Sequence, residues 1–138
     1  MKYLGLDLGS RTLGTAISDN TGLIATSYKT IRHDEEYERL LFEVKDIVEE
    51  LKIDAIVLGF PKNMNNTIGP KGELSLSFKE QLEKTVDIPV YLQDERLTTK
   101  SATDALIMGN VSRKKRKKVV DSLAATIILQ TYLDKKGR

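Results

Sequence analysis

An apolar run at residues 2–9 carries a single carboxylate, Asp7, between glycines at positions 5 and 9. A run of this length that is bounded by glycine is typical of a strand buried on at least one face. Because side chains alternate between the two faces of a sheet, Asp7 shares a face with the two glycines, opposite Leu4, Leu6 and Leu8. Glycines on that face leave bare backbone that a ligand can approach. A lone carboxylate there costs desolvation free energy unless a metal, a cation or hydrogen bonds compensate it, so Asp7 is predicted to belong to a functional site.

Two further strands are predicted directly after the first, over residues 14–19 and 23–31, with a turn at residues 20–22 between them. The third strand is rich in β-branched residues, as strands usually are. Connections this short join only antiparallel neighbours, so the first three strands are expected to form a meander.

The hydrophobic period changes at Asp34, which is a candidate N-cap. From there to Leu51 the apolar residues recur at helical spacing, which predicts an amphipathic helix. The continuous apolar run at residues 54–59 predicts a parallel strand covered on both faces. Residues 60–70 are dense in turn-forming residues and are expected to form a long loop at the end of that strand.

The second half of the chain continues the alternation of helices and strands. A helix is predicted near residues 74–86, a strand at 88–93, a helix through 102–108, and a last helix capped by Ser112 that ends near Leu133. The predicted fold class is α/β and ribonuclease H-like, with a mixed five-stranded sheet (three antiparallel strands, then two parallel ones) flanked by helices.

The composition is that of a globular protein, and one domain is expected over residues 1–138, since 40% of the residues are hydrophobic and 30% charged. The absence of cysteine excludes disulfides, thiolate metal sites and cysteine nucleophiles. No stretch approaches the ~18 uncharged apolar residues of a membrane span, and the first residues lack a signal-peptide pattern. We therefore expect a cytoplasmic protein with no membrane contact.

Three acids are the candidate catalytic and metal-binding residues: Asp7, Glu95 and Asp121. Asp7 and Glu95 lie near the ends of two predicted strands, where sites gather in open sheets. Asp121 lies on the apolar stripe of the last helix. Three converging carboxylates suit Mg²⁺ or Mn²⁺, and the single histidine, His33, cannot form a zinc cluster. Two such ions about 3.5–4 Å apart can activate water and stabilise the leaving oxygen of a phosphodiester.

Each of the three acids also has a purely structural interpretation. Asp7 could pair with Arg11 or Lys2, and Glu95 could take part in a salt bridge on the surface. Asp121 could pair with Lys117, one helical turn earlier. The joint pattern of the three favours a site over these separate pairings.

The net charge of +2 hides a basic block at residues 113–118, which supplies six of the 22 basic residues and leaves 16 basic against 20 acidic residues elsewhere. Such a block indicates a localised contact with a polyanion, or else a solvated charge run. Cations in the first turns of a helix oppose its macrodipole, and a bound phosphate backbone would offset that cost. The candidate nucleic-acid contacts are Arg11, Arg96, Thr98, Lys114, Lys117 and Lys118.

Four blocks of the sequence form a recognisable set: residues 5–19 (GLDLGSRTLGTAISD), 57–61 (VLGFP) with Asn63-Met64, 94–99 (DERLTT) and 120–133 (VDSLAATIILQTYL). Together they resemble the YqgF/RuvX family of Holliday-junction-resolvase-like proteins, which are assigned to pre-16S rRNA processing. The blocks follow the family's order over nearly the whole chain. One departure is Met64-Asn65-Asn66, where the family usually has Met-Asp-Gly; it bears on the loop and not on the three acids.

The resemblance implies a ribonuclease H-like fold, a cytoplasmic bacterial protein and a role in maturing the 5′ end of 16S ribosomal RNA. It also implies that Asp7, Glu95 and Asp121 form the catalytic, metal-binding triad.

The leading hypothesis is a metal-dependent nuclease that acts on structured RNA, namely pre-16S rRNA in ribosomal precursor particles, as a monomer or weak homodimer. A non-catalytic RNA-binding assembly factor and a DNA-junction resolvase are the alternatives. An actin-like sugar kinase also opens with an Asp-Leu-Gly strand, but that fold needs two such domains, which 138 residues cannot supply.

Overall fold

The structure is a computed structural model that describes residues 1–9, 11–61, 69–94 and 113–136, with side chains in the last range from residue 123 onward. The described elements follow in the order β1 (Tyr3–Leu8), β2 (Thr12–Ser18), β3 (Ala25–Arg32), α1 (Tyr37–Leu51), β4 (Ala55–Phe60), α2 (Pro70–Thr85), β5 (Val90–Asp94) and α4 (Arg113–Lys136). The helix predicted through residues 102–108, the Asn65-Asn66 departure and the Ser112 cap lie outside the described residues.

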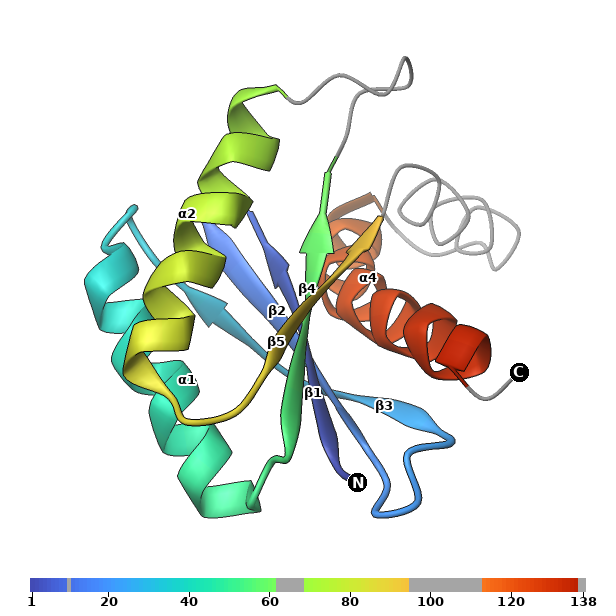
Figure 1. Ribbon diagram of the computed structural model, residues 1–138. Coiled ribbons are helices and arrows are strands. Elements are labelled where there is room, and N and C mark those ends of the chain that lie inside the picture. Colours follow the sequence, from blue (N-terminus) through green and yellow to red (C-terminus); the bar gives the residue numbers. More distant parts are fainter. Residues whose placement is uncertain (10, 62–68, 95–112, 137–138) are drawn as a thin grey trace.

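The described strands form one five-stranded sheet in the order β3-β2-β1-β4-β5 (Figure 1). β1 pairs antiparallel with β2, and β2 with β3, whereas β1 and β4, and β4 and β5, are parallel. The predicted meander followed by two parallel strands is therefore confirmed. β1 lies in the middle of the sheet, between β2 of the antiparallel part and β4 of the parallel part.

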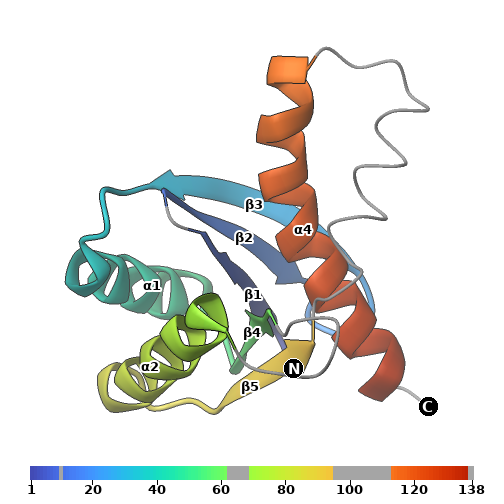
Figure 2. The ribbon, with the colours of Figure 1, turned by 90° about the horizontal axis from the view of Figure 1, so that it is seen from above.

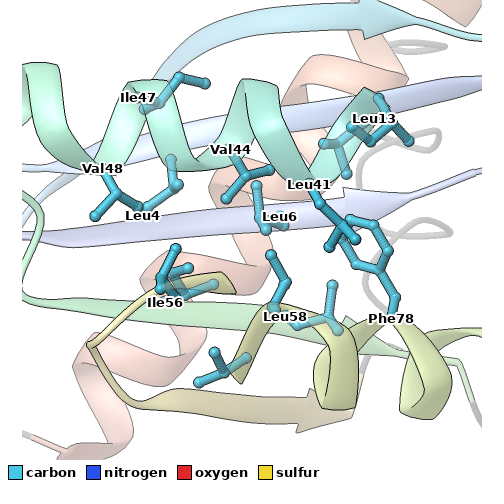
Figure 3. Close-up of a cluster of buried hydrophobic side chains, with 14 of the residues drawn as sticks. Leu4, Leu6, Leu13, Leu41, Val44, Ile47, Val48, Ile56, Leu58 and Phe78 are labelled. Carbon is cyan, nitrogen blue, oxygen red and sulfur yellow. The ribbon is translucent and has the colours of Figure 1, made fainter. Parts of the chain in front are cut away.

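Helices cover both faces of the sheet, with α1 and α2 on one side and α4 on the other (Figure 2). The face toward α1 and α2 is packed with leucine, isoleucine and valine, including Leu4, Leu6, Ile56 and Leu58 (Figure 3). Among the residues whose side chains the structure describes, the core on the α4 face is smaller: Tyr3, Ala16, Ala55, Val57, Ala125, Ile128, Leu129 and Leu133. The predicted alternation along β1, with the leucines on one face and Asp7 on the other, agrees with this division.

Close contact with α4 explains the glycine at position 5. A Cβ atom there would lie 2.7 Å from Leu129 Cβ and 3.1 Å from the carbonyl oxygen of Ala125. At position 9, a Cβ would meet Thr12, whose carbonyl oxygen accepts a hydrogen bond from the Gly9 amide at 2.7 Å. The expectation that the backbone is open to a ligand is therefore wrong for Gly5, because α4 occupies the space.

The start of α1 also differs from the prediction. The helix begins at Tyr37 with Glu36 as N-cap, so Asp34 is not the cap. Glu35 adopts a left-handed conformation (φ 68°), which turns the chain between β3 and the helix. The Asp34 carboxylate instead forms an exposed ion pair with Arg11 at 3.2 Å. Within the described residues, no helix combines the length and the apolar character needed to cross a membrane.

Candidate active site

Asp7 is the penultimate residue of the central strand and is half-buried on the α4 face of the sheet. It pairs with Gly14 of β2, while the preceding Leu6 pairs with Leu58 of β4. Asp7 therefore lies at the carboxyl end of the two parallel strands β1 and β4, where α/β sheets commonly hold their ligands.

α4 runs antiparallel to β1 across this face. Tyr132 contacts Tyr3, with ring centroids 5.9 Å apart, and Leu129 and Ala125 contact Gly5 two residues further along the strand. Two residues of a strand span about 7 Å and one turn of a helix about 5 Å, so the next turn of α4 lies near the height of Asp7. Asp121 is in that turn, four residues before Ala125.

The remaining acid, Glu95, lies outside the described residues and directly follows Asp94, the last residue of β5. Asp94 pairs with Phe60 at the end of β4. Among the described residues, no cluster of three or more acidic, histidine or cysteine side chains could hold a metal ion. The side chains of Glu95 and Asp121 do not belong to that set, so the predicted triad stays a prediction.

His33 fixes the backbone just beyond Asp7, a role that the sequence did not indicate. Its ring is 5% exposed, and Nδ1 accepts a hydrogen bond from the Glu35 amide at 3.0 Å. Nε2 therefore carries the proton of the neutral ring and donates to the Gly9 carbonyl oxygen at 3.0 Å. The ring thereby connects the end of β1 to the turn that starts α1.

Gln130 fixes α4 against the β2–β3 hairpin and was likewise not singled out for this role. Its Oε1 accepts a hydrogen bond from the Ala25 amide at 2.9 Å, and its Nε2 donates to the Leu23 carbonyl oxygen at 2.9 Å. Nε2 also donates to Asp134 at 3.0 Å. A second polar contact joins Ser27 and Thr126 through their hydroxyls at 2.7 Å. These bonds set the rotation and height of α4, and with them the position of Asp121.

The predicted nucleic-acid contacts that the structure describes are Arg11 and three lysine positions at the start of α4. Arg11 follows β1, and its side chain is 78% exposed in the ion pair with Asp34. Lys114, Lys117 and Lys118 belong to the first turns of α4, which extend past the sheet in Figure 2. Arg96 and Thr98 lie outside the described residues.

Comparison with known proteins identifies the family. The profile of the RuvX family, described as "Holliday junction resolvase", matches residues 1–135. The chain belongs to the RuvX family. The resemblance read from the sequence blocks is thereby confirmed.

Relatives of this RuvX-family chain cover nearly its whole length. One from Geobacillus sp. (strain WCH70), named "Putative pre-16S rRNA nuclease", is 52% identical over 137 residues, which are 99% of each chain. Two solved resolvases have the same fold at low identity. They are Thermus thermophilus RuvC in complex with a Holliday junction (TM-score 0.62, 17% identity, 99% of this chain and 96% of that one) and Fowlpox virus resolvase with junction DNA (TM-score 0.63, 15% identity, 100% of both). The predicted ribonuclease H-like fold is confirmed.

Proposed function

We propose that this RuvX-family chain is a cytoplasmic single-domain nuclease that hydrolyses phosphodiester bonds in maturing the 5′ end of pre-16S rRNA. The observation that carries the proposal is the position of Asp7, half-buried at the carboxyl end of the central strand and near the height of the α4 turn that contains Asp121. The name of the Geobacillus relative supports the substrate.

Divalent metal ions fit the proposed donor set, because Asp7, Glu95 and Asp121 offer only carboxylate oxygens, which Mg²⁺ and Mn²⁺ prefer. Asp7 is half-buried on an otherwise apolar strand, where a cation would offset the desolvation of its charge. When bound, the ions would supply activation of water and stabilisation of the leaving oxygen. The rigid strand and the clamped helix would hold the acids in place.

Basic residues on two sides of Asp7 would bind the phosphate backbone. Arg11 and Arg96 can contact a phosphate with two parallel hydrogen bonds, whereas the lysines of α4 neutralise charge more loosely. Thr98 would add a hydroxyl donor. Because the first turns of α4 reach past the sheet, Lys114, Lys117 and Lys118 would contact RNA beyond the cleaved bond in a ribosomal precursor particle.

The test is cleavage of a 5′ precursor segment of 16S rRNA in Mg²⁺ or Mn²⁺ by wild type and Asp7→Asn. Loss of a partner of a metal ligand costs about 10–100-fold, so removing a ligand charge should slow cleavage at least roughly 100-fold. Asp46→Asn, which neutralises an exposed acid of α1 on the opposite face, is the control and should cleave normally. Equal rates for wild type and Asp7→Asn would refute the assignment of Asp7.

Cleavage of DNA junctions is the second candidate, favoured by the family description and by the two resolvases of the same fold. A four-way DNA junction should therefore be assayed beside the RNA. Faster cleavage of the junction would favour the resolvase, and tight RNA binding without turnover in either metal would favour a non-catalytic assembly factor.

A further inference from the structure

A graded cluster of tyrosines lies on the α4 face of the sheet, between the core and the solvent. Tyr3 is 1% exposed and packs against Tyr132, while Tyr91 on the edge strand β5 is 41% exposed. The rings of Tyr91 and Tyr132 are stacked, with centroids 5.7 Å apart and planes inclined by 18°. The edge of the sheet thus carries a flat aromatic side chain supported from beneath by a second ring.

We propose that Tyr91, supported by Tyr132, is a stacking platform for an unpaired base of the RNA substrate. The inference rests on the proposed nuclease function and adds a substrate feature to it, namely a single-stranded segment beside the cleaved bond. Aromatic rings bind single strands because every base has a π-face. A ring already held by stacking loses little further conformational entropy when a base joins it.

The register of the sheet places this ring close to the active site. Tyr91 pairs with Val57, and Val57 with Gly5, so Tyr91 lies two residues below the height of Asp7 and two strands away from β1. At about 3.3 Å per residue and 4.8 Å between strands, the backbone positions of Tyr91 and Asp7 are roughly 12 Å apart. A single strand can span that distance with a few nucleotides.

Positive charge accompanies the rings. The ammonium of Lys136 lies 4.7 Å from the centroid of the Tyr3 ring and donates a hydrogen bond to the Tyr3 hydroxyl. That bond raises the pKa of Lys136, which stays cationic at neutral pH. Lys135 beside it is exposed. A cation next to a stacked ring is the combination that binds the phosphate and base of a single strand, and it favours RNA over an apolar protein partner.

The test uses the full-length chain carrying Asp7→Asn, so that the RNA stays intact, and measures binding in Mg²⁺. The probes are RNA stem-loops whose single-stranded flank is lengthened one nucleotide at a time. Tyr91→Ala should weaken binding of flanked RNA roughly 5- to 100-fold and leave the blunt stem-loop unaffected. Tyr91→Phe should bind normally, and Tyr91→Leu, which keeps apolar cover on Tyr132 without a flat ring, should behave like Tyr91→Ala.

Tyr28→Ala is the matched control, because Tyr28 is 36% exposed on the opposite edge strand β3; it should bind like its parent. Photocrosslinking with 5-iodouridine at successive flank positions should label Tyr91 at one of them. Unchanged affinity of Tyr91→Ala for flanked RNA, or an equal loss on blunt RNA, would overturn the platform. Cleavage by Asp7→Asn at the wild-type rate, with the Tyr91 cross-link present, would refute the active site alone.

Discussion

Hydrogen-bond donors close in the chain control the pKa of Asp19, an exposed carboxylate directly after β2. It accepts hydrogen bonds from the Thr21 hydroxyl and from the amides of Ile24 and Leu23 in the turn between β2 and β3. These bonds lower the pKa of Asp19 from 3.8 to about 2. Because the pKa is lower in the folded state, the stabilisation is complete above the unfolded value and disappears as the pH falls through about 2.

We therefore expect Asp19→Asn to unfold at a lower temperature than wild type at pH 7. The difference in midpoint should shrink as the pH falls from about 4 to 2, where the wild-type carboxyl becomes protonated. Thermal unfolding followed by circular dichroism between pH 2 and 7 measures it. A difference that stays constant over this range would show that the charge of Asp19 is not its source.

At the residue scale, the sequence predicted features that depend on adjacent residues. It did not predict contacts between residues that are far apart in the chain. Alternation along β1 places Asp7 on the correct face, because the pattern is local. The role of Gly5 was misread, because its partner Leu129 lies at the other end of the chain. Gln130 and Ala25 are 105 residues apart in the chain, and His33 and Gly9 are 24 apart. No local sequence pattern therefore predicts either contact.

At the scale of elements, the packing of α4 against β1 determines where Asp121 lies. Gly5→Ala should push the helix away, because the new Cβ would lie 2.7 Å from Leu129 Cβ. We expect a loss of about 1–3 kcal/mol of unfolding free energy, measured in urea, and a loss of cleavage under conditions where the protein stays folded.

Leu4→Val is the control for that experiment, since Leu4 belongs to the core on the α1 and α2 side. Removing one methylene there should cost about 1 kcal/mol and leave the cleavage rate unchanged, because α4 stays seated. If both variants lost cleavage to the same extent, the loss would come from general destabilisation and not from displacement of α4.

The first turns of α4 carry the basic block, and the salt dependence of RNA binding tests its role. Changing Lys114, Lys117 and Lys118 together to Gln should reduce the slope of log affinity for RNA against log salt by about two to three. The fold should be unharmed or slightly more stable, because the lysines oppose the helix dipole. The same change at Lys45, Lys71 and Lys84 of α1 and α2 is the control, and a similar change in slope there would contradict a localised contact.

The antiparallel pairing of the first three strands was predictable at this scale, whereas the start of α1 was not. Short connections between β1, β2 and β3 leave only antiparallel pairing, so the meander follows from their length. Aspartate is a common N-cap residue, but Asp34 lies before the helix because of the left-handed turn at Glu35 and the ion pair with Arg11. Backbone turns of that kind compete with capping and are set by tertiary contacts.

At the scale of the whole molecule, binding of a metal should appear as added stability. A ligand present at 100 times its dissociation constant stabilises the folded state by about 2.7 kcal/mol. We expect Mg²⁺ to raise the unfolding temperature of wild type by several degrees, EDTA to reverse the shift, and Asp7→Asn to show little of it. Asp46→Asn should respond like wild type, and an equal response in Asp7→Asn would place the ion elsewhere.

The two-sided sheet also has a consequence for the order in which the protein is made. All five strands of the described sheet and the helices α1 and α2 leave the ribosome before α4. The first core can therefore close while Tyr3, Ala16, Ala55 and Val57 still face water. The helix that covers them also carries Asp121. A nascent chain therefore acquires its proposed third acid only when its second core closes. Unfinished chains would be both prone to aggregation and inactive.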